Sequence, residues 1–125
     1  MNKMQELAKR AVSCKHWRWL PGMRAVGRKG SPDAWFRAEE SLRSLHGDWR
    51  SALPDLDDPA TAGCLLALVR EAWDRSMLVA YYAPLESGQG WYVAHRFCGD
   101  RDYPVVSAPS YSEAEALVAA LEDAP

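Results

Sequence analysis

The segment at residues 53–73, LPDLDDPATAGCLLALVREAW, constrains the fold more than any other part of the chain. Asp58 followed by Pro59 is a typical helix start, because the aspartate caps exposed N–H groups and proline fits the first helical turn. Apolar residues then recur at helical spacing, at Cys64, Leu65, Leu68, Ala72 and Trp73. The pattern predicts a buried central helix from Asp58 to about Asp74.

Two further helices are predicted, one towards each end of the chain. Residues 3–13 place an apolar stripe at helical spacing opposite a charged face. Near the other end, Ser112 with Glu115 three residues later forms a capping-box pattern, which predicts a helix over 112–122.

Strand-like segments separate the central and last helices. MLVAYYA (77–83) and WYVAHRF (91–97) are rich in β-branched and aromatic residues, and glycines lie between them. PVVSA (104–108) is a third candidate. Together with the helices, these segments predict an α+β fold of antiparallel strands and three helices, in a single small domain over 1–125.

The segment from 31 to 53 has two interpretations. Ser31 and Pro32 resemble a helix start, and apolar residues follow at helical spacing, which predicts a helix over 32–46. Alternatively, MRAV (23–26) and AWFRA (34–38) form two short strands. The helix is the interpretation we adopt from the sequence.

Charge is distributed unevenly along the chain, although the net charge is only −2. Residues 1–50 hold 11 Lys and Arg against 5 Asp and Glu, whereas residues 51–125 hold 4 against 12. The halves therefore carry +6 and −8. Such asymmetry favours an anionic ligand on the basic half, or head-to-tail self-association into a homo-oligomer. Two solvated faces without partners would give the same pattern.

The basic half contains the most distinctive candidate site, CKHWRWLPGMR (14–24). Aromatic faces stack on nucleobases, and arginine pairs with phosphate, so this composition suits a nucleotide-like ligand or single-stranded nucleic acid. Duplex DNA is disfavoured, because no helix-turn-helix pattern is present and the acidic half would be repelled. The candidate ligand-binding residues are Trp17, Arg18, Trp19, Arg24, Arg28 and Lys29.

A structural interpretation of the same stretch is at least as strong. Leu20-Pro21-Gly22-Met23 predicts a type II turn, and tryptophans beside turns usually fill the core. Whether Trp17 and Trp19 face solvent decides between the ligand platform and the core anchor.

Phosphate-binding loops, metal sites and catalytic sites have sequence patterns that this chain does not match. Gly22 and Gly27 have P-loop spacing, but Arg28 and Lys29 stand where a P-loop needs Lys and Ser or Thr. Among cysteines 14, 64 and 98 and histidines 16, 46 and 95, His95 and Cys98 form one loose pair with metal-ligand spacing, and Cys14 and His16 are too close together. A semi-buried histidine on a strand is the better explanation of His95. We therefore predict no metal, no cofactor and no catalytic residues; a small hydrolase using a cysteine or histidine is the weakest alternative.

The sequence also gives expectations about location. The longest apolar run, residues 64–69, is far too short to span a membrane, and the N-terminus lacks the apolar core of a secretory signal. An odd number of widely spaced cysteines is typical of a reducing compartment. These features predict a cytoplasmic protein that does not contact a membrane.

Three blocks of the chain resemble a family of short, largely uncharacterised proteins encoded by phages and prophages: residues 6–24 (with WRWLPGMR), 53–73 and SEAEALVAALE (112–122). The resemblance implies an accessory protein of an infected bacterial cytoplasm, and it supplies no catalytic residues. Small phage accessory proteins often bind a nucleotide signal or a host defence protein. We therefore expect a non-enzymatic binding protein for an anionic nucleotide-like ligand, with a module that inhibits a host protein or self-assembles as the alternative.

Overall fold

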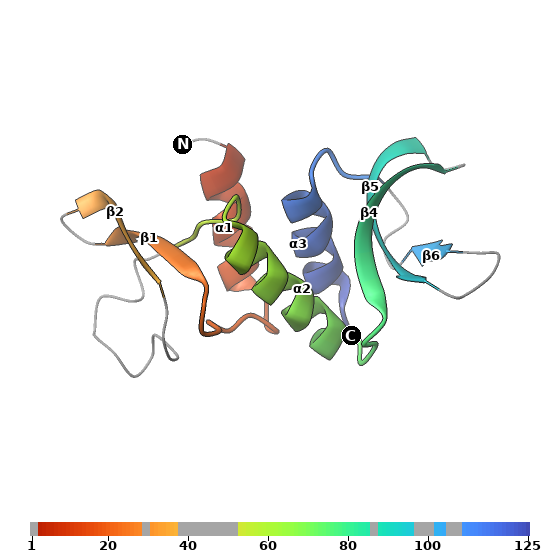
Figure 1. Cartoon of the computed structure of the whole chain (residues 1–125), viewed down its shortest axis with the longest axis horizontal. Coiled ribbons are helices and arrows are strands. Elements are labelled where there is room, and N and C mark those ends of the chain that lie inside the picture. The colour runs from red at the N-terminus through yellow and green to blue at the C-terminus, as the bar shows by residue number, and fades with distance from the viewer. Residues whose placement is uncertain (1–2, 29–30, 38–52, 86–87, 97–101, 105–108) are drawn as a thin grey trace. The chain divides into compact units, whose positions relative to one another are not determined.

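The computed structural model describes residues 3–28, 31–37, 53–85, 88–96, 102–104 and 109–125. Within these ranges the chain forms three helices and two antiparallel sheets, so the predicted α+β class is confirmed (Figure 1). The chain divides into two compact units. The first holds residues 1–13 and 17–64, and the second holds residues 14–16 and 65–125. The single-domain organisation inferred from the sequence stays a prediction.

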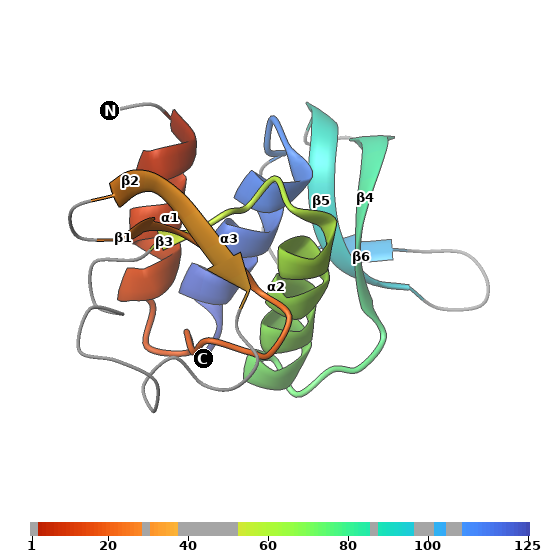
Figure 2. The ribbon, with the colours of Figure 1, turned by 60° about the vertical axis from the view of Figure 1, so that its left-hand side comes forward.

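The first unit contains helix α1 and a small sheet (Figure 2). Helix α1 (Lys3–Ser13) matches its predicted range and buries Leu7, Ala8 and Ala11. Strands β1 (Arg24–Arg28), β2 (Ser31–Arg37) and β3 (Leu53–Pro54) form a sheet of order β2-β1-β3. Helix α1 packs against β3, so its apolar stripe forms part of the core of this unit.

Strand β2 shows that the predicted helix over 32–46 is wrong at residues 32–37, and residues 38–46 lie outside the described part. The alternative pair of strands is the one that forms: Ala25 lies opposite Phe36, and Val26 opposite Trp35. The preference for a helix start at Pro32 involves only neighbouring residues. The main-chain hydrogen bonds between β2 and β1 outweigh this preference. Proline is tolerated here because β2 lies at the edge of the sheet that the described strands form.

Helix α2 (Pro59–Ala72) begins where the sequence predicts. Its first residues belong to the first unit and those from Leu65 onwards to the second. It ends in a Schellman motif: Asp74 takes a left-handed conformation with φ of 52°, and the N–H of Arg75 is donated to the carbonyl of Arg70 at 2.9 Å. Asp74 therefore acts as the helix stop.

The second unit pairs an antiparallel sheet with helix α3 (Figure 1). Strands β4 (Leu78–Leu85), β5 (Gly88–Arg96) and β6 (Asp102–Pro104) occur in the order β4-β5-β6. The predicted strands 77–83 and 91–97 are therefore confirmed over 78–83 and 91–96, and both extend further towards the hairpin turn. Residue 97 lies outside the described part. The third strand covers 102–104 instead of starting at 104; residues 105–108 lie outside the described part.

Helix α3 (Glu113–Asp123) packs on β4 and β5. Its predicted cap is confirmed, since the Ser112 hydroxyl accepts a hydrogen bond from the N–H of Glu115 at 3.1 Å. The buried residues of the helix are Ala114, Ala116, Leu117, Val118, Ala120 and Leu121. Helix α3 is therefore a core helix of the second unit.

Candidate functional site

The turn at Leu20–Met23 has the predicted type II geometry. The N–H of Met23 is donated to the carbonyl of Leu20 at 3.2 Å, and Gly22 has φ of 98°, a value that side chains disfavour. The turn is anchored from both sides: Met23 is fully buried, and the Cys64 thiol donates to the carbonyl of Pro21 at 3.5 Å. These contacts therefore fix the direction in which the chain continues after the two tryptophans.

The two tryptophans before this turn contact each other edge to face. Their ring centroids are 5.4 Å apart and their planes meet at 81°. Trp19 is only 7% exposed, whereas Trp17 is half-buried. The Trp17 indole N–H is buried and has no hydrogen-bond acceptor among the described residues. Trp19 is thus a core residue, and only Trp17 has surface available to a ligand.

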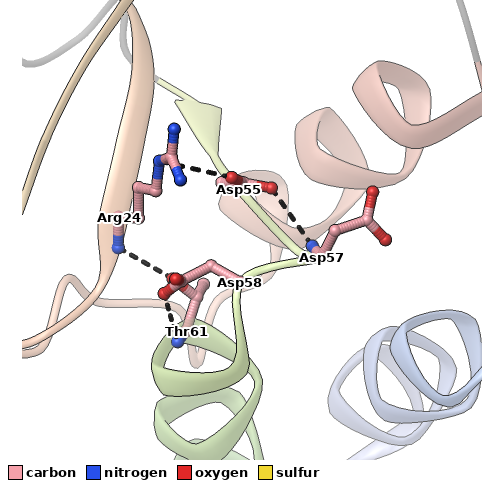
Figure 3. A network of polar contacts seen from close by, with 5 residues as sticks. All are labelled: Arg24, Asp55, Asp57, Asp58 and Thr61. Atoms are coloured by element: carbon pink, nitrogen blue, oxygen red, sulfur yellow. Dashed lines mark hydrogen bonds and ion pairs between the residues drawn. The ribbon is translucent and has the colours of Figure 1, made fainter.

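Arg24 is half-buried and bonds to other residues of the first unit. Its guanidinium Nε lies 3.4 Å from a carboxylate oxygen of Asp55, and the N–H of Asp55 is donated to the Arg24 carbonyl at 2.8 Å. The N–H of Arg24 is donated to the Thr61 hydroxyl at 2.7 Å (Figure 3). These bonds tie β1 to the segment that leads into α2, so Arg24 has a structural role.

The aspartates before α2 complete this network (Figure 3). One carboxylate oxygen of Asp58 accepts the N–H of Thr61 at 3.0 Å and the Thr61 hydroxyl at 2.9 Å. Asp55 accepts the N–H of Asp57 at 3.2 Å. A turn and a helix cap therefore account for Asp55 and Asp58 without assigning them acid–base chemistry.

The other predicted site residues are Arg18, Arg28 and Lys29. Arg18, between the two tryptophans, is exposed. Arg28 ends β1, but its side chain and the whole of Lys29 lie outside the described part. Of the six predicted residues, the structure brings Trp17 and Trp19 into contact and directs Arg24 towards Asp55.

No group of three His, Cys, Asp or Glu residues in the described ranges could hold a metal ion. His16 donates from Nε2 to the main-chain oxygen of Pro125 at 2.8 Å, and it lines a small hollow with Leu68, Glu71 and Ala72. His46, Cys98 and the side chain of His95 lie outside the described part.

Sequence reasoning missed an aromatic pair on the hairpin of the second unit. Tyr82 on β4 lies opposite Trp91 on β5, with ring centroids 6.1 Å apart and planes at 71°. Tyr82 remains 56% exposed. The two strands were predictable, but the pair depends on their register, which no local pattern specifies.

Comparisons of the chain with protein-family models, with curated proteins and with solved structures find no match. In the described ranges no helix has the length and apolar character needed to cross a membrane.

Proposed function

We propose that this chain is a non-enzymatic binding protein for an anionic, nucleotide-like ligand, with Trp17 and Arg18 as the central contacts. The observation that carries the proposal is the half-buried ring of Trp17, held edge to face by the buried Trp19 beside the exposed Arg18. A ring fixed in this way loses little conformational entropy when a base stacks on it. Arginine adds charge-assisted hydrogen bonds to phosphate.

The roles of the predicted site residues differ in this proposal. Trp19 positions Trp17, and Arg24 supports the fold through Asp55. Arg28 and Lys29 supply further positive charge from the end of β1 and the residue after it. No bond of the ligand is broken. The resemblance to phage and prophage proteins supports a role in the cytoplasm of an infected bacterium, where the protein would sequester a nucleotide signal of host defence.

Thermal unfolding against a panel of mono-, di- and cyclic nucleotides tests the proposal. A ligand at 100 times its dissociation constant adds about 2.7 kcal/mol of stability, which raises the melting temperature by several degrees. We expect Arg18→Ala to reduce this shift strongly. Arg75→Ala, also at an exposed arginine, is the matched control and should leave the shift unchanged.

Two results would contradict the proposal: a panel in which no nucleotide shifts the melting temperature, or an Arg18→Ala protein that binds as tightly as the parent. Trp17→Leu adds a second test, because it keeps apolar bulk against Trp19 while removing the stacking surface. It should abolish the nucleotide shift and keep the circular dichroism spectrum of the folded protein.

A protein–protein interaction module is the second candidate, and the exposed apolar side chains of the second unit favour it. Met77 is 58% exposed, Tyr82 56% and Tyr111 95%. High salt would maintain or strengthen docking through these apolar side chains, whereas it would weaken the contact between Arg18 and a phosphate. Binding measured at two salt concentrations therefore separates the two candidates.

A further inference from the structure

Strand β4 forms one edge of its sheet, because the order is β4-β5-β6 and β5 pairs with β4 along its whole length. In the described part of the chain, no strand lies on the other side of β4. The sequence of the strand, LVAYYAPL, contains no charged residue. Edge strands usually carry lysine or another charge that prevents pairing with a second chain, and β4 lacks this protection.

The hydrogen bonds identify which residues of β4 direct their main-chain groups outwards. Leu78 donates its N–H to the Arg75 carbonyl at 3.4 Å, and its own carbonyl accepts from Arg70 Nε at 2.8 Å. These groups therefore face away from β5. In an antiparallel pair the direction alternates, so Ala80, Tyr82 and Pro84 also face outwards.

The hydrogen bonds on the side of β5 that faces away from β4 support this assignment. Trp91 lies opposite Tyr82, and it exchanges both main-chain hydrogen bonds with Ser110, at 2.9 and 3.0 Å. Trp91 therefore directs its main-chain groups away from β4. The Tyr82–Trp91 pair is a non-hydrogen-bonded pair, and the N–H and carbonyl of Tyr82 face the open edge.

One end of this edge is closed, because the main-chain groups of Leu78 are already bonded to Arg75 and Arg70. At the other end Pro84 has no N–H and offers only its carbonyl. The residues that offer both groups are Ala80 and Tyr82, with two donors and two acceptors together. A strand that pairs here must supply the complementary groups at two alternate positions.

We propose that the occupant of this edge is β4 of a second copy of the chain, paired antiparallel about a two-fold axis through Tyr81. Ala80 then lies opposite Tyr82 of the second copy, and Tyr82 opposite Ala80 of the second copy. Each pair exchanges two main-chain hydrogen bonds, so the N–H and carbonyl groups of Ala80 and Tyr82 in both copies are all used.

The pairing in this register is limited to these two residues of each strand. Arg70 and the Arg75 carbonyl already occupy the outward side of Leu78, so Pro84 of the second copy turns away from this position and its carbonyl faces solvent. Because β4 is uncharged, the two-fold axis brings no like charges together within the strands. The two Tyr82 rings lie diagonally across the new pair, a separation that aromatic side chains span, and extend the Tyr82–Trp91 contact of each copy.

Sedimentation equilibrium of the full chain over a range of concentrations tests the proposal, and we expect a monomer–dimer equilibrium. Tyr82→Lys places a charge beside the open edge and should weaken dimerisation about tenfold or more. Tyr111→Lys is the matched control, since Tyr111 is 95% exposed and lies outside β4. It should leave the equilibrium unchanged.

Hydrogen exchange of the parent protein gives a test without any substitution. The N–H groups of Ala80 and Tyr82 should exchange rapidly in dilute solution and become protected as the dimer forms. A chain that stays monomeric up to about 1 mM overturns the proposal, as does a dimer in which these two N–H groups exchange rapidly. The proposal is independent of the nucleotide ligand, because Arg18→Ala should not change the dimer.

Discussion

Replacing Thr61 by valine should destabilise the protein, because the hydroxyl of this buried residue makes two hydrogen bonds at the start of α2. Thr61 is fully buried; its hydroxyl accepts from the N–H of Arg24 at 2.7 Å and donates to the Asp58 carboxylate at 2.9 Å (Figure 3). Valine has nearly the same shape, so Thr61→Val leaves no cavity. It removes the partner of the Arg24 N–H and one donor to Asp58.

The size of the effect follows from these two bonds. An unsatisfied buried donor costs about 1–3 kcal/mol, and a hydrogen bond to a charged group contributes about 1.5–3 kcal/mol. Asp58 keeps the main-chain N–H of residue 61 as a partner. We therefore expect Thr61→Val to lower the free energy of unfolding by about 2–4 kcal/mol.

Urea denaturation followed by tryptophan fluorescence measures this change, with Thr61→Ser as the control. Serine keeps both hydrogen bonds and loses one buried methyl group, which should cost only about 1 kcal/mol. The denaturant slope should stay constant in both variants. If Thr61→Val proves as stable as Thr61→Ser, the hydroxyl does not hold β1 to α2 and the reasoning is refuted.

Three further substitutions test the second unit, each by the same denaturation experiment. Asp74→Gly should raise stability by about 0.5–1 kcal/mol, because glycine adopts the left-handed conformation without a steric penalty; a loss would contradict the helix-stop role. Gly90→Ala should cost about 1–3 kcal/mol, because the added Cβ would lie 2.7 Å from Pro109 Cβ and 2.8 Å from a main-chain oxygen; an unchanged midpoint would contradict this packing. Trp73→Phe should cost about 2 kcal/mol, because the indole N–H caps the carbonyl of Ala120 in the last turn of α3 at 2.8 Å; a neutral result would show that water replaces this bond.

The helices of this protein were the most predictable part of the fold. Asp58 and Pro59 define the start of α2, and Ser112 the start of α3, because a cap involves only residues within one helical turn. The type II turn at Pro21-Gly22 belongs to the same category, since proline and glycine restrict the main chain at their own positions. The hairpin strands β4 and β5 were recognised from their composition.

The segment at 32–37 marks the limit of such local reasoning. Its helix-start residues and apolar spacing indicated a helix, but it forms β2 against β1. A strand gains its hydrogen bonds from another part of the chain, so the outcome depends on a partner that local pattern does not include.

The sequence by itself determined the α+β class, the helix caps, the turn after the tryptophans and the uneven charge of the two halves. Only the tertiary structure decided that Trp19 is buried while Trp17 is partly exposed, that Arg24 pairs with Asp55, and that Tyr82 meets Trp91 at the sheet edge. The first group of features arises from residues a few positions apart, whose geometry the covalent chain restricts. The second group requires segments far apart in the sequence to meet, and packing alone sets those contacts.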